Sequence, residues 1–451
     1  MAPTRPRPTS AFVALVLLGL TGLAIAACSS TNAVTEGSVK CTPGNFVYCR
    51  CENRSEGTKL CHPDGVSFDP CRCDGTDEPF TGNTDGGLGD ASLQPVDSGG
   101  PTTGPTIDAK CVGKLGVVAG AADDLDVYVA AYTGPGVFAV SKSHGPGLRG
   151  PATVLPVGTT LVATYLSRFS LLAWTKLAAG TWSSPNSIGA ATSASSPSAT
   201  LLNGQLRLFY LGTDGHFRTG IYSGTTGWDE ATALAETTAD AGAPTPGNSA
   251  PAAAVVGSSI TLAFSGGDGA LARETYSSGS WSAVTKFSGV SAYDAAPAVV
   301  ALDPGGPKDL LMVYSGADLL MHVATREASN KVWNTSTLFD TAASSTEMAL
   351  AALPGGKAML VYRASNKQGY YSVWSLATGF GLPAELVAGK NPELASAPSM
   401  TRGQCGSDAT LAYAQSDGLV RILRYTAGAL NGPFEVAGIP RATFVGVGEL
   451  P

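Results

Sequence analysis

The run Leu206-Arg207-Leu208-Phe209-Tyr210 is the first of five related stretches whose spacing decides the fold. A short apolar run that ends in an aromatic residue returns at Phe264, Tyr314, Tyr362 and Tyr413, at intervals of 48 to 54 residues. A unit of this length cannot bury its own apolar face, so successive units must pack on one another. The chain is therefore a repeat protein.

Each repeat divides into four predicted strands. The first begins with a small residue and a proline, as at Ser196-Pro197, and the second is the apolar run. The next turn is Asp-Gly at 214–215, 268–269 and 417–418, a dipeptide that favours tight hairpins. The third strand ends near an aromatic residue, and the fourth opens on a large ring. Those rings are Trp182, Trp228, Trp281, Trp333, Phe380 and Phe434.

Four-stranded units arranged radially are typical of a β-propeller. Second strands are also predicted at Leu125–Tyr132 and Leu161–Tyr165, which gives seven blades, with six or eight left open. A solenoid with free ends is the structural alternative. Closure is favoured by an extra strand at Ala442–Val447, which can complete the first blade. It is also favoured by Cys111, just before the first blade, and Cys405, within the last, because a disulfide between them would hold the ring closed. We expect an all-β propeller over residues 109–451.

Residues 1–27 have the pattern of an export signal. Arg5 and Arg7 precede an apolar stretch that ends in Ile25-Ala26-Ala27-Cys28. This ending resembles the lipobox of bacterial lipoproteins. The resemblance implies cleavage before Cys28 and acylation of that cysteine, which would anchor the chain to a membrane. Ser29 after the cysteine favours the outer membrane or cell surface within the cell envelope; an ordinary secretory peptide is the alternative.

The other eight cysteines are expected to form disulfides, because an exported chain meets oxidising conditions. Six of them lie within residues 41–73, a cysteine-rich module too small for a hydrophobic core. The eight are Cys41, Cys49, Cys51, Cys61, Cys71, Cys73, Cys111 and Cys405. The module's Cys41-Thr-Pro-Gly start and its two Cys-Arg-Cys pairs resemble a motif of predicted myxobacterial lipoproteins, which implies no function. A zinc site is the alternative that oxidising conditions disfavour.

Two polar segments flank this module. Residues 28–40 are predicted to be a lipidated tether, and residues 74–108 a disordered linker rich in Gly, Pro and acidic residues. The linker contains seven acidic residues and no lysine or arginine, which matches the net charge of −7 of the whole chain. The remainder is near neutral and offers no clustered basic face for nucleic acid. We expect a monomer that contacts the membrane through its anchor.

The Asp-Gly turns and the Tyr…Trp unit of the repeats resemble those of sialidase-like and PLL-type lectin propellers. This resemblance implies carbohydrate binding, since many lectin propellers hold sugars against a Trp exposed between blades. The candidate ligand-binding residues are Trp182, Trp228, Trp281 and Trp333. The alternative is that these rings only pack between neighbouring blades.

Signatures of catalysis are missing from the sequence. The four histidines are scattered, and there is no HExxH, nucleophile elbow or phosphate-binding loop. The Asp-Gly turns supply too few oxygen ligands for Ca²⁺, and no repeat contains the Ser-x-Asp-x-Gly-x-x-Trp box of sialidases. We expect no enzyme, cofactor or metal site, and a surface module that binds a carbohydrate or an envelope protein. A sialidase-like glycoside hydrolase with three convergent arginines and a structural interaction scaffold are the alternatives.

Overall fold

The structure is a computed structural model that describes part of the chain. The described residues are 46–50, 56–60, 62, 64, 67–69, 106–122, 126–143, 147–213, 215–224, 227–229, 249–266, 268–292, 296–318 and 320–451. Residues 1–99 and 100–451 are separate compact units. The predicted export signal, Cys28, the tether, the pairing of the module's cysteines and most of the linker lie outside the described residues. Within the described ranges, no helix has the length and apolar character needed to cross a bilayer.

The first unit contains one described hairpin. Strand β1 (Phe46–Arg50) pairs antiparallel with β2 (Glu56–Leu60), and Cys49 lies opposite Gly57. This hairpin lies inside the predicted cysteine-rich module.

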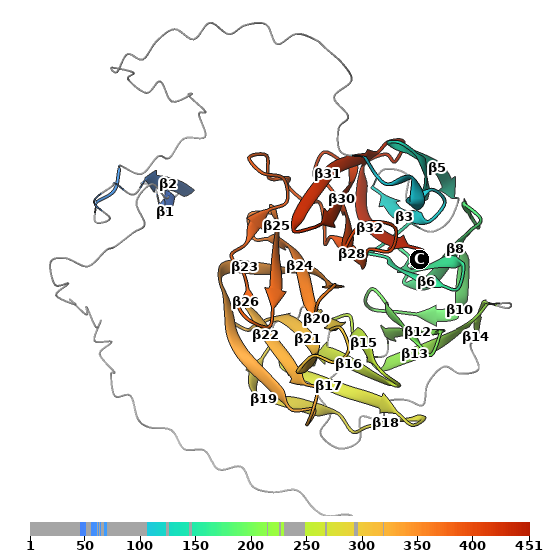
Figure 1. Ribbon diagram of the computed structural model, residues 1–451, viewed down its shortest axis with the longest axis horizontal. Helices are drawn as coiled ribbons and strands as arrows, with labels where there is room; N and C mark the ends of the chain where they lie inside the picture. The colour runs from blue at the N-terminus through green and yellow to red at the C-terminus, as the bar shows by residue number, and fades with distance from the viewer. Residues whose placement is uncertain are drawn as a thin grey trace, which may run out of the picture. The chain divides into compact units, whose positions relative to one another are not determined.

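The described part of residues 106–451 forms seven blades around one axis (Figure 1). The fold is therefore the all-β, seven-bladed propeller that the repeat spacing predicts. The strands of each blade are given from the axis outwards. The first blade contains β32 (Ala442–Glu449), β3 (Leu115–Ala121), β4 (Val127–Gly134) and β5 (Val137–Ser143); the second β6 (Thr153–Val157), β7 (Thr160–Leu166), β8 (Leu171–Ala178), β9 (Thr181–Trp182) and β10 (Asn186–Thr192); the third β11 (Ser198–Leu202), β12 (Gln205–Leu211), β13 (Phe217–Ser223) and β14 (Gly227–Asp229); and the fourth β15 (Ala252–Val256), β16 (Ser259–Ser265), β17 (Ala270–Ser277), β18 (Ser280–Trp281) and β19 (Thr285–Ser291). The fifth blade contains β20 (Ala298–Ala301), β21 (Lys308–Ser315), β22 (Leu320–Glu327) and the start of β23 (Trp333–Leu353); the sixth the end of β23, β24 (Lys357–Ala364), β25 (Gly369–Ser375), β26 (Gly379–Phe380) and β27 (Ala384–Glu385); and the seventh β28 (Ser399–Arg402), β29 (Ala409–Ala414), β30 (Val420–Thr426) and β31 (Ala429–Val436).

The second strand of each blade explains the repeated apolar run. This strand is covered by a neighbouring blade on each face, so both sets of alternating side chains are buried, as along β7, β16, β21 and β29. A strand buried on both faces is continuously apolar instead of alternating. The aromatic residue near its end fills the interface, and Tyr165, Tyr362 and Tyr413 are fully buried.

The ring closes where the two ends of the propeller meet. Strand β32, from the C-terminus, pairs antiparallel along the whole of β3, and Figure 1 shows the red β32 beside the cyan β3. Cys111 and Cys405 form a disulfide with a Cα–Cα distance of 5.2 Å across a sequence separation of 294. The predictions of an extra closing strand and of this disulfide are both confirmed.

The sequence misplaces one strand of the first blade. Leu125–Tyr132 is predicted to be its second strand, but the structure places β4, which covers most of that stretch, in third position. The C-terminus supplies the inner strand, so the chain enters the blade at its second strand, β3. Because β3 and β4 are both almost wholly buried, their apolar patterns do not distinguish the two positions.

The Asp-Gly turns join the second and third strands of a blade and also hydrogen-bond toward the next blade. In the fourth blade the Asp268 carboxylate accepts a hydrogen bond from the Ala270 N–H at 3.0 Å, and Gly269 has a φ of +75°. The Gly269 carbonyl then accepts the N–H of Ala292, in the connection to the fifth blade, at 2.7 Å. The Gly418 carbonyl accepts the Ala442 N–H at 2.8 Å in the same way. Glycine adopts this φ without a steric cost, so the dipeptide forms the turn and also joins two blades.

Candidate functional site

The four tryptophans proposed as ligand contacts all lie on outer strands and pack toward the preceding blade. Trp281 of β18 meets Phe209 edge-on, with ring centroids 5.8 Å apart, and Trp333 meets Phe287 edge-on at 5.4 Å. Trp228 is buried, whereas Trp182, Trp281 and Trp333 are partly exposed. The rings therefore take part in packing between blades, and their contact with a ligand stays a prediction.

Their hydrogen-bonding environments differ from blade to blade. The indole N–H of Trp182 donates to the carbonyl oxygen of Ala130 in the first blade at 3.0 Å. The buried indole nitrogens of Trp228 and Trp333 have no hydrogen-bond partner among the described residues. The repeated ring therefore has no uniform polar role, and a ligand site must be sought in what surrounds a particular ring.

The interface between the third and fourth blades carries the most unusual surroundings. We call the set Arg207, Thr219, Glu274, Tyr276 and Trp281 the Glu274 cluster. Phe217 of β13 packs in the core of this interface, and Thr219, two residues further along the strand, faces the same way. Ala272 and Tyr276 of β17 pack there too, which places Glu274, midway between them, on that face.

Several polar atoms of this cluster lack partners. Among the described residues, Arg207 Nε, Thr219 Oγ1 and Glu274 Oε2 are buried without a hydrogen bond. The Arg207 guanidinium lies over the Tyr276 ring, 4.6 Å from its centroid. Tyr276 and Trp281 are partly exposed, with ring centroids 5.3 Å apart. The interface therefore combines a donor, a hydroxyl and a carboxyl with two aromatic rings at the surface.

Burial also changes the acidity of Glu274, a residue that is 3% exposed. Removal from water disfavours the charged carboxylate and raises the pKa of Glu274 from 4.5 to about 7. The carboxyl group therefore exchanges its proton near neutral pH. Such shifts are concentrated at functional sites.

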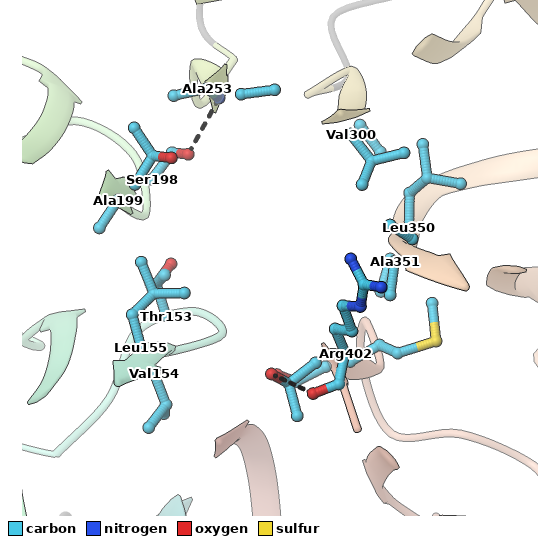
Figure 2. Close-up of a pocket in the computed structure, with 18 of the residues that line it drawn as sticks. Thr153, Val154, Leu155, Ser198, Ala199, Ala253, Val300, Leu350, Ala351 and Arg402 are labelled. Atoms are coloured by element: carbon cyan, nitrogen blue, oxygen red, sulfur yellow. Dashed lines mark hydrogen bonds between the residues drawn. The ribbon is translucent and has the colours of Figure 1, made fainter. Parts of the chain in front are cut away.

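A second candidate site is the cavity along the propeller axis, with a volume of about 660 Å³. The inner strands of all seven blades line it, and Figure 2 shows Thr153, Ser198, Val300, Leu350 and Arg402 around the open space. Its walls are mainly Ala, Val and Leu side chains, without an aromatic ring among the lining residues. Its size is in the range of small-molecule sites.

The hydroxyl groups at the inner edge are engaged in bonds between blades. Ser198 Oγ accepts the Ala253 N–H at 3.2 Å, and Ser399 Oγ accepts the Val447 N–H at 3.1 Å. Thr153 Oγ1 donates to the Pro197 carbonyl at 3.0 Å. These groups join neighbouring inner strands, and Arg402 is the one cationic side chain among the described lining residues.

The axial cavity also tests the sialidase-like alternative. Arg402 is the one arginine among the described lining residues, and the one carboxylate there, Glu449, is fully buried. Glu449 accepts the backbone N–H groups of Gln404 at 2.7 Å and Cys405 at 3.1 Å. Seven other arginines of the repeats lie outside the cavity lining: Arg207, Arg218, Arg273, Arg326, Arg363, Arg421 and Arg424. The described lining residues thus do not bring three arginines together, and among the described residues no His, Cys, Asp and Glu group forms a metal site.

Comparison with known proteins shows what the fold of this chain resembles and does not show its activity. No protein-family model matches the sequence, and no curated protein matches it. Among solved structures, a triple mutant of AofleA from Arthrobotrys oligospora has a TM-score of 0.52 at 12% identity, covering 67% of this chain and 91% of that chain. The fucose-specific lectin from Aleuria aurantia has a TM-score of 0.46 at 14% identity, covering 64% and 96%. Two prolyl endopeptidases are represented by a structure with a TM-score of 0.43 at 11% identity, covering 73% and 51%.

The likeness to the AofleA variant, at 12% identity, is a likeness of fold alone. The Aleuria aurantia lectin is described as six-bladed, whereas the described residues of this chain form seven blades. At such identities, the ligands of those proteins do not transfer to this one by similarity alone.

Sequence reasoning missed Glu274, although a signal was present. Glu274 pairs with Leu262, two residues before the aromatic end of the second strand. The same position in the other third strands is uncharged, being occupied by Thr175, Gly220, Ala324, Ser372 and Leu423. A comparison of aligned repeats for the one departure in charge would have found it. Arg402 carried no comparable signal, because its place at the cavity follows from ring closure.

Proposed function

We propose that this protein is a carbohydrate-binding propeller and that the Glu274 cluster holds the sugar. The observation that carries the proposal is that unpaired polar atoms of Arg207, Thr219 and Glu274 face the same blade interface as the partly exposed rings of Tyr276 and Trp281. An unpaired buried polar atom costs free energy that a ligand hydroxyl group can recover. Sugars supply such hydroxyl groups together with C–H faces that pack on aromatic rings.

The chemistry of the cluster favours a neutral sugar. Hydrogen bonds that involve a charged guanidinium or carboxylate are the stronger ones, and the hydroxyl groups of a sugar can accept from Arg207 and donate to Glu274. Once Glu274 has lost its proton, the cluster contains one cation and one carboxylate and therefore offers an anionic sugar no net attraction. The propeller fold that this chain shares with the fucose-specific lectin from Aleuria aurantia is consistent with this use but does not identify the sugar.

The proposal is tested by screening the purified protein on a glycan array and measuring the affinity for a bound glycan by calorimetry. Arg207→Met and Glu274→Gln should each weaken binding about 10- to 100-fold, since each removes a charged hydrogen-bonding group. Arg273→Met is the matched control: Arg273 lies on the opposite face of β17, with its guanidinium 5.8 Å from the Phe287 ring centroid. A screen without any saturable glycan, or equal losses in Arg207→Met and Arg273→Met, would refute the proposal.

We further propose that the propeller is displayed at the cell envelope from a lipid on Cys28, through the module and the acidic linker. The support is the lipobox-like ending of the apolar segment before Cys28. Metabolic labelling with a fatty-acid analogue should mark the wild-type chain and leave Cys28→Ser unlabelled. Equal labelling of both would exclude the anchor without affecting the sugar site. Capture of an envelope protein in the absence of glycan would favour the scaffold alternative.

A further inference from the structure

The axial cavity is independent of the Glu274 cluster and has a different chemistry. Its lining residues are mostly aliphatic and include no aromatic ring, so a sugar would find no ring to stack on. Pockets of this kind fix a ligand by an apolar body and one or two well-placed polar groups. The hydroxyl groups of Thr153, Ser198 and Ser399 take part in bonds between blades, and the described lining residues include one cationic side chain that can orient an anionic ligand.

Arg402 is the cationic side chain of the cavity lining. It lies at the end of β28, its side chain is 48% exposed, and Figure 2 shows it extending into the open space. Its guanidinium Nη2 lies 3.2 Å from Asp303 Oδ1, on the turn between β20 and β21. This is the one ion pair that the described residues give Arg402, whereas a guanidinium carries five N–H donors in a planar fork.

Asp303 is held in place independently of Arg402. Its second carboxylate oxygen accepts the backbone N–H of Gly356, from the sixth blade, at 3.1 Å. This hydrogen bond lowers the pKa of Asp303 below its usual range, and the charge of Arg402 adds to the effect. Asp303 therefore stays ionised at neutral pH and competes with a ligand anion for Arg402.

We propose that the axial cavity binds a small aliphatic carboxylate, with its hydrocarbon chain among the inner strands and its carboxylate on Arg402. A carboxylate matches the planar guanidinium through two parallel hydrogen bonds. A phosphate dianion would need a second cation, and the described lining residues supply none. The side chains of Val300, Leu350 and Ala351 offer apolar contacts to a hydrocarbon chain, and no aromatic ring among the described lining residues is available for a sugar to stack on.

Octanoate is the probe, and octan-1-ol, with the same chain and no charge, is its control. The full exported chain carrying Cys28→Ser is purified without detergent, because a detergent or an acyl anchor would compete for an apolar cavity. Calorimetry should show saturable octanoate binding and about 10- to 100-fold weaker binding of octan-1-ol. Equal binding of both compounds, or no saturable heat with octanoate up to about 5 mM, overturns the proposal.

Two variants at the mouth give effects of opposite sign. Arg402→Gln should weaken octanoate binding about 10- to 100-fold, whereas Asp303→Asn should strengthen it by up to about fivefold because the competing carboxylate is gone. A purely structural role of the ion pair would not produce a gain in affinity, so unchanged or weaker binding by Asp303→Asn contradicts the proposal. Equal binding of inorganic phosphate would show a general anion site and overturn the assignment to an aliphatic ligand. Glu274→Gln should leave octanoate binding unchanged, which separates this site from the proposed sugar site.

Discussion

Replacement of Glu274 by Gln should change how the stability of the propeller depends on pH. Burial raises the pKa of Glu274 from 4.5 to about 7, so the folded protein holds this proton more tightly than the unfolded chain does. Its contribution to the free energy of unfolding is greatest below pH 4.5, where both states are protonated. The contribution falls as the pH rises through the window from 4.5 to about 7 and is fully lost above it.

The size of the effect follows from the two pKa values. Each pKa unit corresponds to about 1.4 kcal/mol, so the interval between 4.5 and about 7 is worth about 3 kcal/mol between pH 4 and pH 8. Glutamine has nearly the same shape and does not titrate. The difference in free energy of unfolding between Glu274→Gln and wild type should therefore shift by about 3 kcal/mol in favour of the variant across that range.

Urea unfolding of both proteins at several pH values measures this difference, with tryptophan fluorescence as the signal. Asp268→Asn is a suitable control, because its hydrogen bond with Lys286 lowers the pKa of Asp268. A lowered pKa contributes stability that is lost only as the pH falls below the normal range of an aspartate. The Asp268→Asn difference should therefore be flat from pH 5 to pH 8. If the Glu274→Gln difference is equally flat, Glu274 is not a buried carboxyl and the site argument loses its central group.

Three further predictions concern the scaffold. Cys405→Ser should lower the free energy of unfolding by as much as ~5 kcal/mol, because the disulfide closes a very long loop. The variant should also contain a Cys111 thiol that reacts under denaturing conditions. Reactive thiols at both Cys111 and Cys405 in the wild type would contradict this. Gly116→Ala should lower the free energy of unfolding by about 1–3 kcal/mol, because the new Cβ would lie 2.7 Å from the Trp182 ring. Gly224→Ala is the control: its Cβ would have no atom within 4 Å, so the same urea titration should show almost no change. Arg326→Met should cost about 1.5–3 kcal/mol, since it removes the hydrogen bonds of 2.8 and 3.1 Å that Arg326 donates to the buried Asp309 and leaves Lys331, at 2.6 Å, as the charged partner of that carboxylate. Thermal unfolding in which Arg326→Met matches the wild type would contradict it.

The fold could be predicted because every blade has the same packing and turn requirements. The second strand must be apolar on both faces, and the turn after it must place a glycine carbonyl toward the next blade, as Gly269 and Gly418 do. Both requirements leave a periodic mark in the sequence. The first blade broke the pattern because its inner strand, β32, comes from the other end of the chain. No local signal distinguishes a second strand from a third when both are buried.

The sites could not be predicted in the same way, since they depend on neighbours that are distant in sequence. Arg207 and Glu274 belong to different blades and face one interface only once the third and fourth blades are packed. Arg402 meets Asp303 across the sixth blade. The pairing of these groups is set by the angle and spacing of the blades, which no short stretch of sequence encodes.

The repeated tryptophans illustrate where function can be sought in a repeat protein. A ring is needed at that position in most blades to fill the interface, as the contacts of Trp281 with Phe209 and of Trp333 with Phe287 show, so its recurrence reports packing. A buried carboxyl group without a charged partner has the opposite meaning, because it costs free energy in a blade that would be more stable without it. Glu274 breaks the repeat at a position where the other third strands are uncharged. The departure from the repeat, and not the repeat itself, is therefore the better guide to a candidate site in this propeller.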